Sequence, residues 1–309
     1  MKRLRLLAFA TAAFAYAVIV LGFVVRITDS GMGCGDHWPL CNGRLIPAFA
    51  GADVIIEYAH RLAVLGLGVL IVALVATALL GRKEPGARGP GGTLRPALLA
   101  VGLLVLQSLI GAMSVKLELP PHTVVLHLAT GLALLAAPVI LGLRAGVLAG
   151  TTQPPETGVA GRGGILAALV LAAAVILLGG MTATTGASVS CQGFPLCNGQ
   201  IWPTSGASGL PHIHWTHRLL AYGLFLHLLG LGLGMRRRKA PQRVQSAAWM
   251  AFGLVAAQAT VGAVMVLTIL PPIWRGLHAA LGTGVWVGLV WLRWVAGGMA
   301  DRRIRHLWR

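Results

Sequence analysis

Four histidines lie inside long apolar segments of this 309-residue sequence: His60, His127, His217 and His278. Each is about six residues from one end of its segment, so at a helical rise of 1.5 Å per residue all four would lie roughly 9 Å below one face of a membrane. Ionisable side chains are costly inside a membrane and usually have a function there. Two imidazoles at equal depth on two helices of a bundle can bind an iron porphyrin from both faces. We therefore predict that the four histidines are axial ligands of haem iron.

Other interpretations of these histidines stay open. A buried histidine can be a core residue that is hydrogen-bonded to a backbone carbonyl or a hydroxyl group, and we expect this role for His227, which lies at mid-membrane depth. Zinc binding is less well supported, because neither half of the chain offers a third and fourth ligand at a suitable depth. The equal depth and the pairing of the four histidines favour haem.

The motifs around these histidines occur twice in the same order. His60 and His217 are 157 residues apart, and His127 and His278 are 151 residues apart. Each half has an even number of apolar segments, so both halves would insert the same way up, as parallel repeats. The repeated segments are Asp36–Gly43 with Gln192–Gly199, Glu57-x2-His60-Arg61 with His214-x2-His217-Arg218, Gln107-x3-Gly111 with Gln258-x3-Gly262, and Leu126-His127 with Leu277-His278.

The two halves differ at Glu57, whose counterpart is His214. Glu57 lies three residues before His60 and therefore on the same helical face. A carboxyl group beside a haem can move protons or stabilise a developing positive charge. We therefore predict a catalytic site in the first half, formed by Glu57, His60 and His127, and a stable haem site in the second. Exposure of Glu57 at the membrane interface is the alternative.

Further repeated residues are candidates for contacts to a cofactor. Arg61 and Arg218 would bind haem propionates through paired hydrogen bonds, or would extend to the membrane interface without a ligand. Gln107 and Gln258 would bond to a cofactor edge or to another helix. Repeated glycines would let a macrocycle or a neighbouring helix approach closely; they are Gly111, Gly131, Gly262 and Gly282.

Two cysteine pairs lie outside the apolar segments at repeated positions. The outer face of the membrane is oxidising, so we predict the disulfides Cys34–Cys41 and Cys191–Cys197. Their spacing excludes covalent haem attachment through a C-x-x-C-H motif. Thiol–disulfide exchange at the first pair is the alternative to a purely structural role.

The whole chain has the composition of a membrane protein. Hydrophobic residues make up 56% of it and charged residues 11%, against roughly 25% charged residues in soluble proteins. This composition excludes a water-soluble enzyme and a nucleic-acid-binding protein, despite a net charge of +17. We predict an all-α integral membrane protein whose eight transmembrane helices form two pseudo-symmetric four-helix bundles. The expected spans are 6–26, 54–80, 96–115, 121–143, 164–184, 212–234, 245–268 and 272–297.

The distribution of basic residues predicts the topology. With an N-terminal bundle at 1–144, a linker at 145–162 and a C-terminal bundle with a basic tail at 163–309, most lysines and arginines fall on the side of the two termini. This places both termini in the cytoplasm and the chain in the cell membrane. The run 236–239 would bind anionic membrane lipid or simply flank a span. The opposite side receives Arg26, Arg44, Arg61, Lys116, Arg218 and Arg275.

At these residues the sequence resembles the haem A synthases of bacteria and mitochondria. The resemblance covers nearly the whole chain and includes the paired E-x-x-H-R and H-x-x-H-R motifs, one histidine in the fourth and one in the eighth span, and the cysteine pairs. It implies oxidation of the C8 methyl group of haem O to the formyl group of haem A, through hydroxylated intermediates, for cytochrome oxidase biogenesis. It also implies that His217 and His278 hold haem b, that His60 and His127 contact haem O, and that turnover needs Glu57.

The resemblance implies haem O synthase, cytochrome oxidase assembly factors and an electron donor as partners, and the sequence does not identify the donor. The iron porphyrin supplies the redox chemistry and the protein positions it, so an axial ligand in the first half would have to loosen for dioxygen to bind there. The alternative function is a bis-histidine dihaem electron-transfer protein that oxidises quinol. It would explain the four histidines, but neither the difference between Glu57 and His214 nor the cysteine loops.

Overall fold

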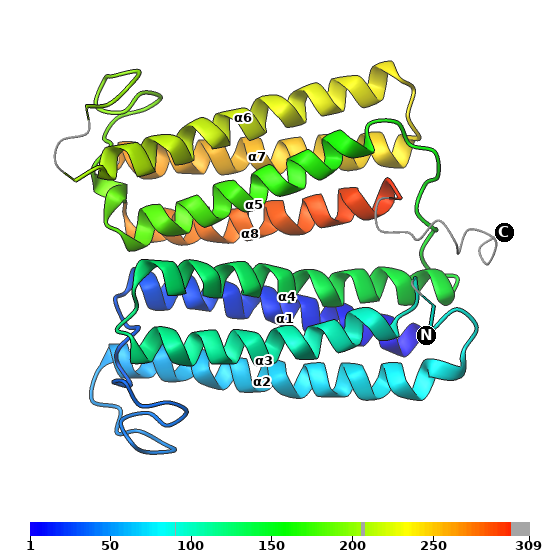
Figure 1. Cartoon of the computed structure of the whole chain (residues 1–309), viewed down its shortest axis with the longest axis horizontal. Helices are drawn as coiled ribbons and strands as arrows, with labels where there is room; N and C mark the ends of the chain where they lie inside the picture. The colour runs from blue at the N-terminus through cyan, green and yellow to red at the C-terminus, as the bar shows by residue number, and fades with distance from the viewer. Residues whose placement is uncertain (90, 205–207, 298–309) are drawn as a thin grey trace.

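The computed structural model describes residues 1–89, 91–204 and 208–297. Eight long α-helices make up most of this part of the chain (Figure 1). Two short 3-10 helices, η1 (Gly81–Lys83) and η2 (Ala187–Val189), follow α2 and α5. The long helices are α1 (Lys2–Ile27), α2 (Ala52–Leu80), α3 (Leu94–Lys116), α4 (Pro121–Leu148), α5 (Arg162–Thr184), α6 (Leu210–Arg237), α7 (Gln242–Leu267) and α8 (Pro272–Val295).

Seven of these helices, α1 to α7, are long and apolar enough to cross a membrane. Their outer faces carry large apolar side chains that no part of the described protein covers; on α2, for example, Leu65, Val69 and Val72 are 64–66% exposed. Such faces are stable against lipid tails and unfavourable in water. The chain is therefore a multi-pass membrane protein with an all-helical fold, as predicted. The remaining helix, α8, is rich in tryptophan and glycine, which lowers its hydropathy.

The helices associate mainly within each half of the chain. In the first half α1 contacts α2, α2 contacts α3, α3 contacts α4, and α4 returns to α1. The same ring of contacts joins α5, α6, α7 and α8, and in Figure 1 these four helices lie together on one side of the molecule. Contacts between the two groups run through α1 and α4 on one side and α5 and α8 on the other.

Small residues allow the close approach of the helices. Ala97 and Ala100 of α3 are fully buried, and so are Ala248 and Ala251 of α7, which follow them at an offset of 151 residues. Lipid tails are as apolar as leucine, so helix association in a membrane depends on such close van der Waals packing rather than on exclusion of water. The repeat in the sequence therefore includes the packing faces as well as the histidines.

A short connection between helices α4 and α5 joins the two halves of the chain. Helix α4 continues past residue 144 to Leu148 and ends where Gly150 adopts a left-handed conformation, with φ of +66°. Gly150 N–H donates to Val147 O at 3.0 Å and Thr151 N–H donates to Gly146 O at 2.9 Å, which is how such a glycine closes a helix. Helix α5 then begins at Arg162, which leaves residues 149–161 between the two helices.

Candidate functional site

The structure brings together the histidine pairs that the repeat predicted. His60 on α2 and His127 on α4 lie within electrostatic range of each other in the first half. In the second half, the ring centres of His217 on α6 and His278 on α8 are 6.4 Å apart, with an angle of 77° between the ring planes. Each pair therefore spans the interior of its own group of four helices.

The geometry of the second pair fits a haem group. Two imidazoles that bind one metal ion from opposite sides have ring centres about 6 Å apart, because each metal–nitrogen bond is about 2 Å long. The separation of 6.4 Å between His217 and His278 agrees with this value. His217 Nδ1–H donates to Val175 O at 3.0 Å, which leaves Nε2 as the ligand nitrogen. A carbonyl partner of this kind is usual for a metal-binding histidine.

The other ligand candidates differ from an ordinary core histidine in the hydrogen bonding of Nδ1. His227 is hydrogen-bonded as a core histidine should be, since its Nε2 lies 2.8 Å from Gly164 O. By contrast, Nδ1 of His60, His127 and His278 is buried without a hydrogen-bond partner among the described residues. An unpaired buried polar atom costs free energy, so a core role explains His227 better than it explains these three. The residues present fit a haem group in both halves.

A glycine on the preceding helix makes room for each of the four imidazoles. A Cβ atom added to that glycine would lie 2.9–3.3 Å from Cε1 of the histidine ring, closer than packed side chains normally come. Any larger residue would push the ring inward, so glycine fixes how far each imidazole can withdraw toward the neighbouring helix. The four pairs are Gly22 with His60, Gly111 with His127, Gly179 with His217, and Gly262 with His278.

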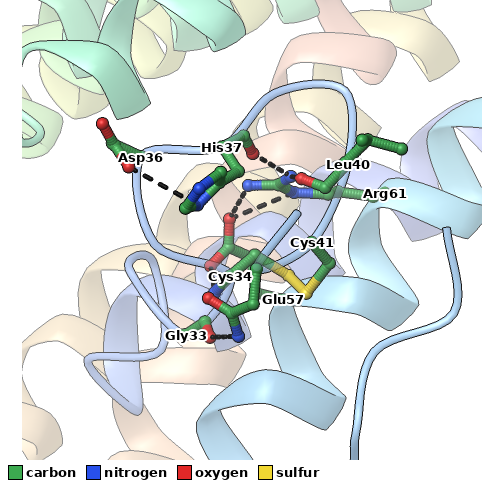
Figure 2. Close-up of polar contacts among 9 residues, drawn as sticks. Gly33, Cys34, Asp36, His37, Leu40, Cys41, Glu57 and Arg61 are labelled. Carbon is green, nitrogen blue, oxygen red and sulfur yellow. Dashed lines mark hydrogen bonds and ion pairs between the residues drawn. A yellow bond between two sulfur atoms is a disulfide. The ribbon is translucent and has the colours of Figure 1, made fainter. Parts of the chain in front are cut away.

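Glu57 binds the first cysteine loop (Figure 2). Its carboxylate is only 4% exposed. Oε2 accepts a hydrogen bond from the backbone N–H of Cys34 at 2.7 Å, and Oε1 accepts two from the guanidinium of Arg61. Nη1 of Arg61 in turn donates to the carbonyls of His37 at 2.7 Å and Leu40 at 2.6 Å. The carboxylate is therefore neither exposed nor free, and it connects the loop to helix α2 one turn before His60.

Arg218 makes the corresponding contacts in the second half. Its Nη1 donates to the carbonyls of Gly193 at 2.8 Å and Leu196 at 2.9 Å, and its Nη2 donates to Cys191 O at 2.6 Å. The neutral His214 replaces the carboxylate: its Nδ1–H donates to Ala187 O at 3.1 Å, and its Nε2 accepts from Arg218 Nε at 3.3 Å. Both arginines thus clamp a cysteine loop against the end of a helix, and each uses four of its five N–H groups to do so.

Both predicted disulfides are present. Cys34–Cys41 and Cys191–Cys197 join residues with Cα atoms 4.4 and 4.8 Å apart, and all four cysteines are buried. Asn198 completes the second loop, because its side-chain amide donates to Ser190 O at 3.0 Å and its carbonyl oxygen accepts from the Gln192 N–H at 2.9 Å. The disulfides therefore hold together the loops whose carbonyls the two arginines bind.

Comparisons with known proteins identify the family of the chain. The family described as cytochrome oxidase assembly protein matches residues 5–54 and 48–290 of the chain. A haem A synthase from Alkalihalophilus pseudofirmus is 32% identical over 86% of this chain and 88% of its own length. The chain belongs to this family. A haem A synthase from Symbiobacterium thermophilum is 34% identical over 94% of this chain and 95% of its own, and one from Halalkalibacterium halodurans is 36% identical over 72% of each.

Sequence reasoning about this member of the cytochrome oxidase assembly family missed three residues of the site. Gly22 and Gly179, which lie against His60 and His217, are 157 residues apart, the same offset as the two histidines, so the repeat could have revealed them. The third is Thr130, whose hydroxyl donates to Gln107 Oε1. No repeat could have indicated it, because it has no polar counterpart in the second half.

Proposed function

We propose that this protein is a haem A synthase, which oxidises the C8 methyl group of haem O to a formyl group through hydroxylated intermediates. The observation that carries the proposal is the pair of imidazoles 6.4 Å apart in the second half, with His60 and His127 at the repeated positions of the first half, in a chain whose relatives are named haem A synthases. The product would serve cytochrome oxidase, in agreement with the assembly family to which the chain belongs.

The two histidine pairs would bind different haem groups. His217 and His278 would hold haem b, because the Val175 carbonyl fixes the orientation and tautomer of His217. His60 and His127 would receive haem O, because their half contains Glu57, whose carboxylate is buried near His60. A bound haem supplies redox chemistry that no side chain can supply, and the chain's own residues position it.

The loop contacts give Glu57 and the two arginines a positioning role. Glu57 connects Cys34 and Arg61 to the helix that carries His60, so it would set the position of the first loop above the substrate and keep water away from it. Arg61 and Arg218 would hold the two loops, and each keeps one N–H group with which to bind a haem propionate. Glu57 would therefore contribute to catalysis by holding the first loop in place as well as through its charge.

The arrangement in the membrane follows from the same repeat. We infer eight spans in two pseudo-symmetric bundles, with α8 as the eighth, because it has 24 residues and packs against α5 and α7 as the other helices of the ring do. The bundles would be 1–144 and 163–309, joined by the linker 145–162. Basic residues place both termini in the cytoplasm, with the cysteine loops on the oxidising outer face of the cell membrane.

The test is to produce the protein together with a source of haem O, extract the haem and separate it by chromatography. Haem A, or a hydroxylated intermediate, should appear beside haem b, and no modified haem should appear with His60→Ala. Haem b alone, at two per chain, would overturn the proposal and favour a dihaem electron-transfer protein. Haem O synthase, cytochrome oxidase assembly factors and the electron donor are the partners to seek once haem A is found.

A further inference from the structure

The two repeated glutamines make different hydrogen bonds. In the first half, Nε2 of Gln107 on α3 lies 3.1 Å from Nε2 of His127 on α4. In the second half, Nε2 of Gln258 on α7 donates instead to the backbone carbonyl of His278, at 2.9 Å, and does not bond to its ring. The two glutamines occupy the same position in the repeat, so the difference must come from their surroundings.

Thr130 accounts for this difference. Its hydroxyl lies within hydrogen-bond distance of Oε1 of Gln107 and also of the backbone carbonyls of Leu126 and His127, both at 3.1 Å, and a bond to Oε1 turns the NH2 group of the amide toward His127. The corresponding residue of the second half, at the same offset of 151, is Leu281. Without a hydroxyl group there, Oε1 of Gln258 is buried with no hydrogen-bond partner among the described residues. A single threonine therefore sets the orientation of the amide.

The bond from Gln107 occupies Nε2 of His127, the ring atom that corresponds to the one left free for iron in His217. An amide N–H donates, so Nε2 of His127 accepts with its lone pair. The same lone pair would form a bond to a metal ion, and a ring nitrogen cannot use it twice. Coordination by His127 therefore requires the hydrogen bond to break, whereas His278 has no such competitor among the described residues.

We propose that Gln107 and Thr130 are positioning residues that make His127 the exchangeable axial ligand of the first site. When His127 turns to Gln107, the iron keeps His60 and has an open position for a small ligand. His278 has no alternative partner and stays bound. This inference rests on the proposed function, since it assumes a haem between His60 and His127.

The experiment measures carbon monoxide bound per chain by the reduced holoprotein, together with the fraction of five-coordinate haem from its resonance Raman spectrum. The wild type should bind carbon monoxide at one of its two haems. Thr130→Val removes the hydroxyl at nearly constant volume, and carbon monoxide binding should fall about fivefold, the effect of losing one hydrogen bond of ordinary net strength. Leu281→Thr should have the opposite effect and raise binding at the second haem.

Thr283→Val is the matched control. Thr283 is a buried threonine on α8 whose hydroxyl donates to Ala279 O at 3.0 Å, within its own helix. This variant loses a hydroxyl in the membrane without touching either glutamine, so its carbon monoxide binding should equal that of the wild type.

Two results would overturn the inference, and they are distinguishable. Unchanged carbon monoxide binding in Thr130→Val at full haem content would show that the pair does not control His127, and would leave the proposed function standing. A wild-type protein without haem in its first half would overturn the proposed function and this inference together, and the haem content alone reveals it. If Thr130→Val does not fold, Gln107→Leu tests the same hydrogen bond from the other side.

Discussion

The two halves hold their cysteine loops with the same guanidinium clamp but with different partners behind it. Arg61 and Arg218 both bind carbonyls of a disulfide-closed loop. Behind Arg61 stands the carboxylate of Glu57, which also binds the Cys34 N–H; behind Arg218 stands the neutral imidazole of His214. A repeat can thus keep its architecture and change the charge at one position. The first half has a buried ion pair above its histidines, whereas in the second half the described partners of the Arg218 guanidinium are all neutral.

The largest difference between the halves is expected when a ligand is removed. His278→Ala should abolish the bis-imidazole spectrum of haem b and lower haem A production by at least about 100-fold, because loss of an outer partner alone costs 10–100-fold. His127→Ala should stop haem A production but leave haem b in place, since the two sites belong to different groups of helices. Haem content per chain and optical spectra of the purified variants measure both effects. Equal loss of haem b from the two variants would contradict the division into two independent sites.

The ion pair between Glu57 and Arg61 should stabilise the first loop more than the hydrogen bond between His214 and Arg218 stabilises the second loop. Glu57→Ala leaves the Cys34 N–H and the Arg61 guanidinium without their acceptor, and breaking a buried ion pair costs about 3 kcal/mol. His214→Ala removes one hydrogen bond to a carbonyl, worth about 1 kcal/mol, and one from the Arg218 guanidinium, worth about 1.5 kcal/mol. We therefore expect a protease to cut the first loop faster in Glu57→Ala than it cuts the second loop in His214→Ala.

Two further variants of Glu57 separate the effect of its charge from the effect of its shape. Glu57→Gln keeps an oxygen for the Cys34 N–H, so its first loop should resist proteolysis more than that of Glu57→Ala. Glu57→His copies the second half, and loss of haem A production with an intact loop in that variant would assign a catalytic role to the charge itself. A first loop that is as resistant in Glu57→Ala as in the wild type would mean that the carboxylate does not hold it.

The glycines beside the histidines allow a finer comparison. A Cβ atom at residue 179 would lie 2.9 Å from His217 Cε1, against 3.3 Å between residue 22 and His60. His217 is also fixed by its bond to Val175 O, so its ring cannot move away without losing that bond. Gly179→Ala should therefore lower the free energy of unfolding by about 1–3 kcal/mol and reduce the haem b content. Gly22→Ala should lower the free energy of unfolding by less. Thermal unfolding in detergent and haem content test the order, and a reversed order would show that ring mobility does not control the cost.

The sequence predicted the elements and the pairs, and failed where a contact depends on the path of the backbone. Apolar length and the repeat located the eight helices to within five residues at each end, and the cysteine positions predicted both disulfides. The contacts of Arg61 and Arg218 with loop carbonyls were not predictable, because carbonyl direction is a property of the folded loop and is not encoded by residue type. The orientation of the Gln107 side chain could not be predicted from the sequence either, because it depends on a contact with Thr130 on the neighbouring helix.

The smallest expected effect concerns the contact between the halves. Tyr16 of α1 donates to Ala280 O of α8 at 2.7 Å, two residues after His278, so one hydrogen bond connects the first group of helices to the backbone of the second haem site. Tyr16→Phe should lower the free energy of unfolding by only about 0.6 kcal/mol, the average for hydrogen bonds between membrane helices. Tyr222→Phe is the control, because its hydroxyl on α6 donates to Pro195 O of the second loop, within the second half of the chain. If Tyr16→Phe alone also changes the spectrum of haem b, the first half influences the second through this bond; an unchanged spectrum would mean that the halves are joined mechanically but act independently.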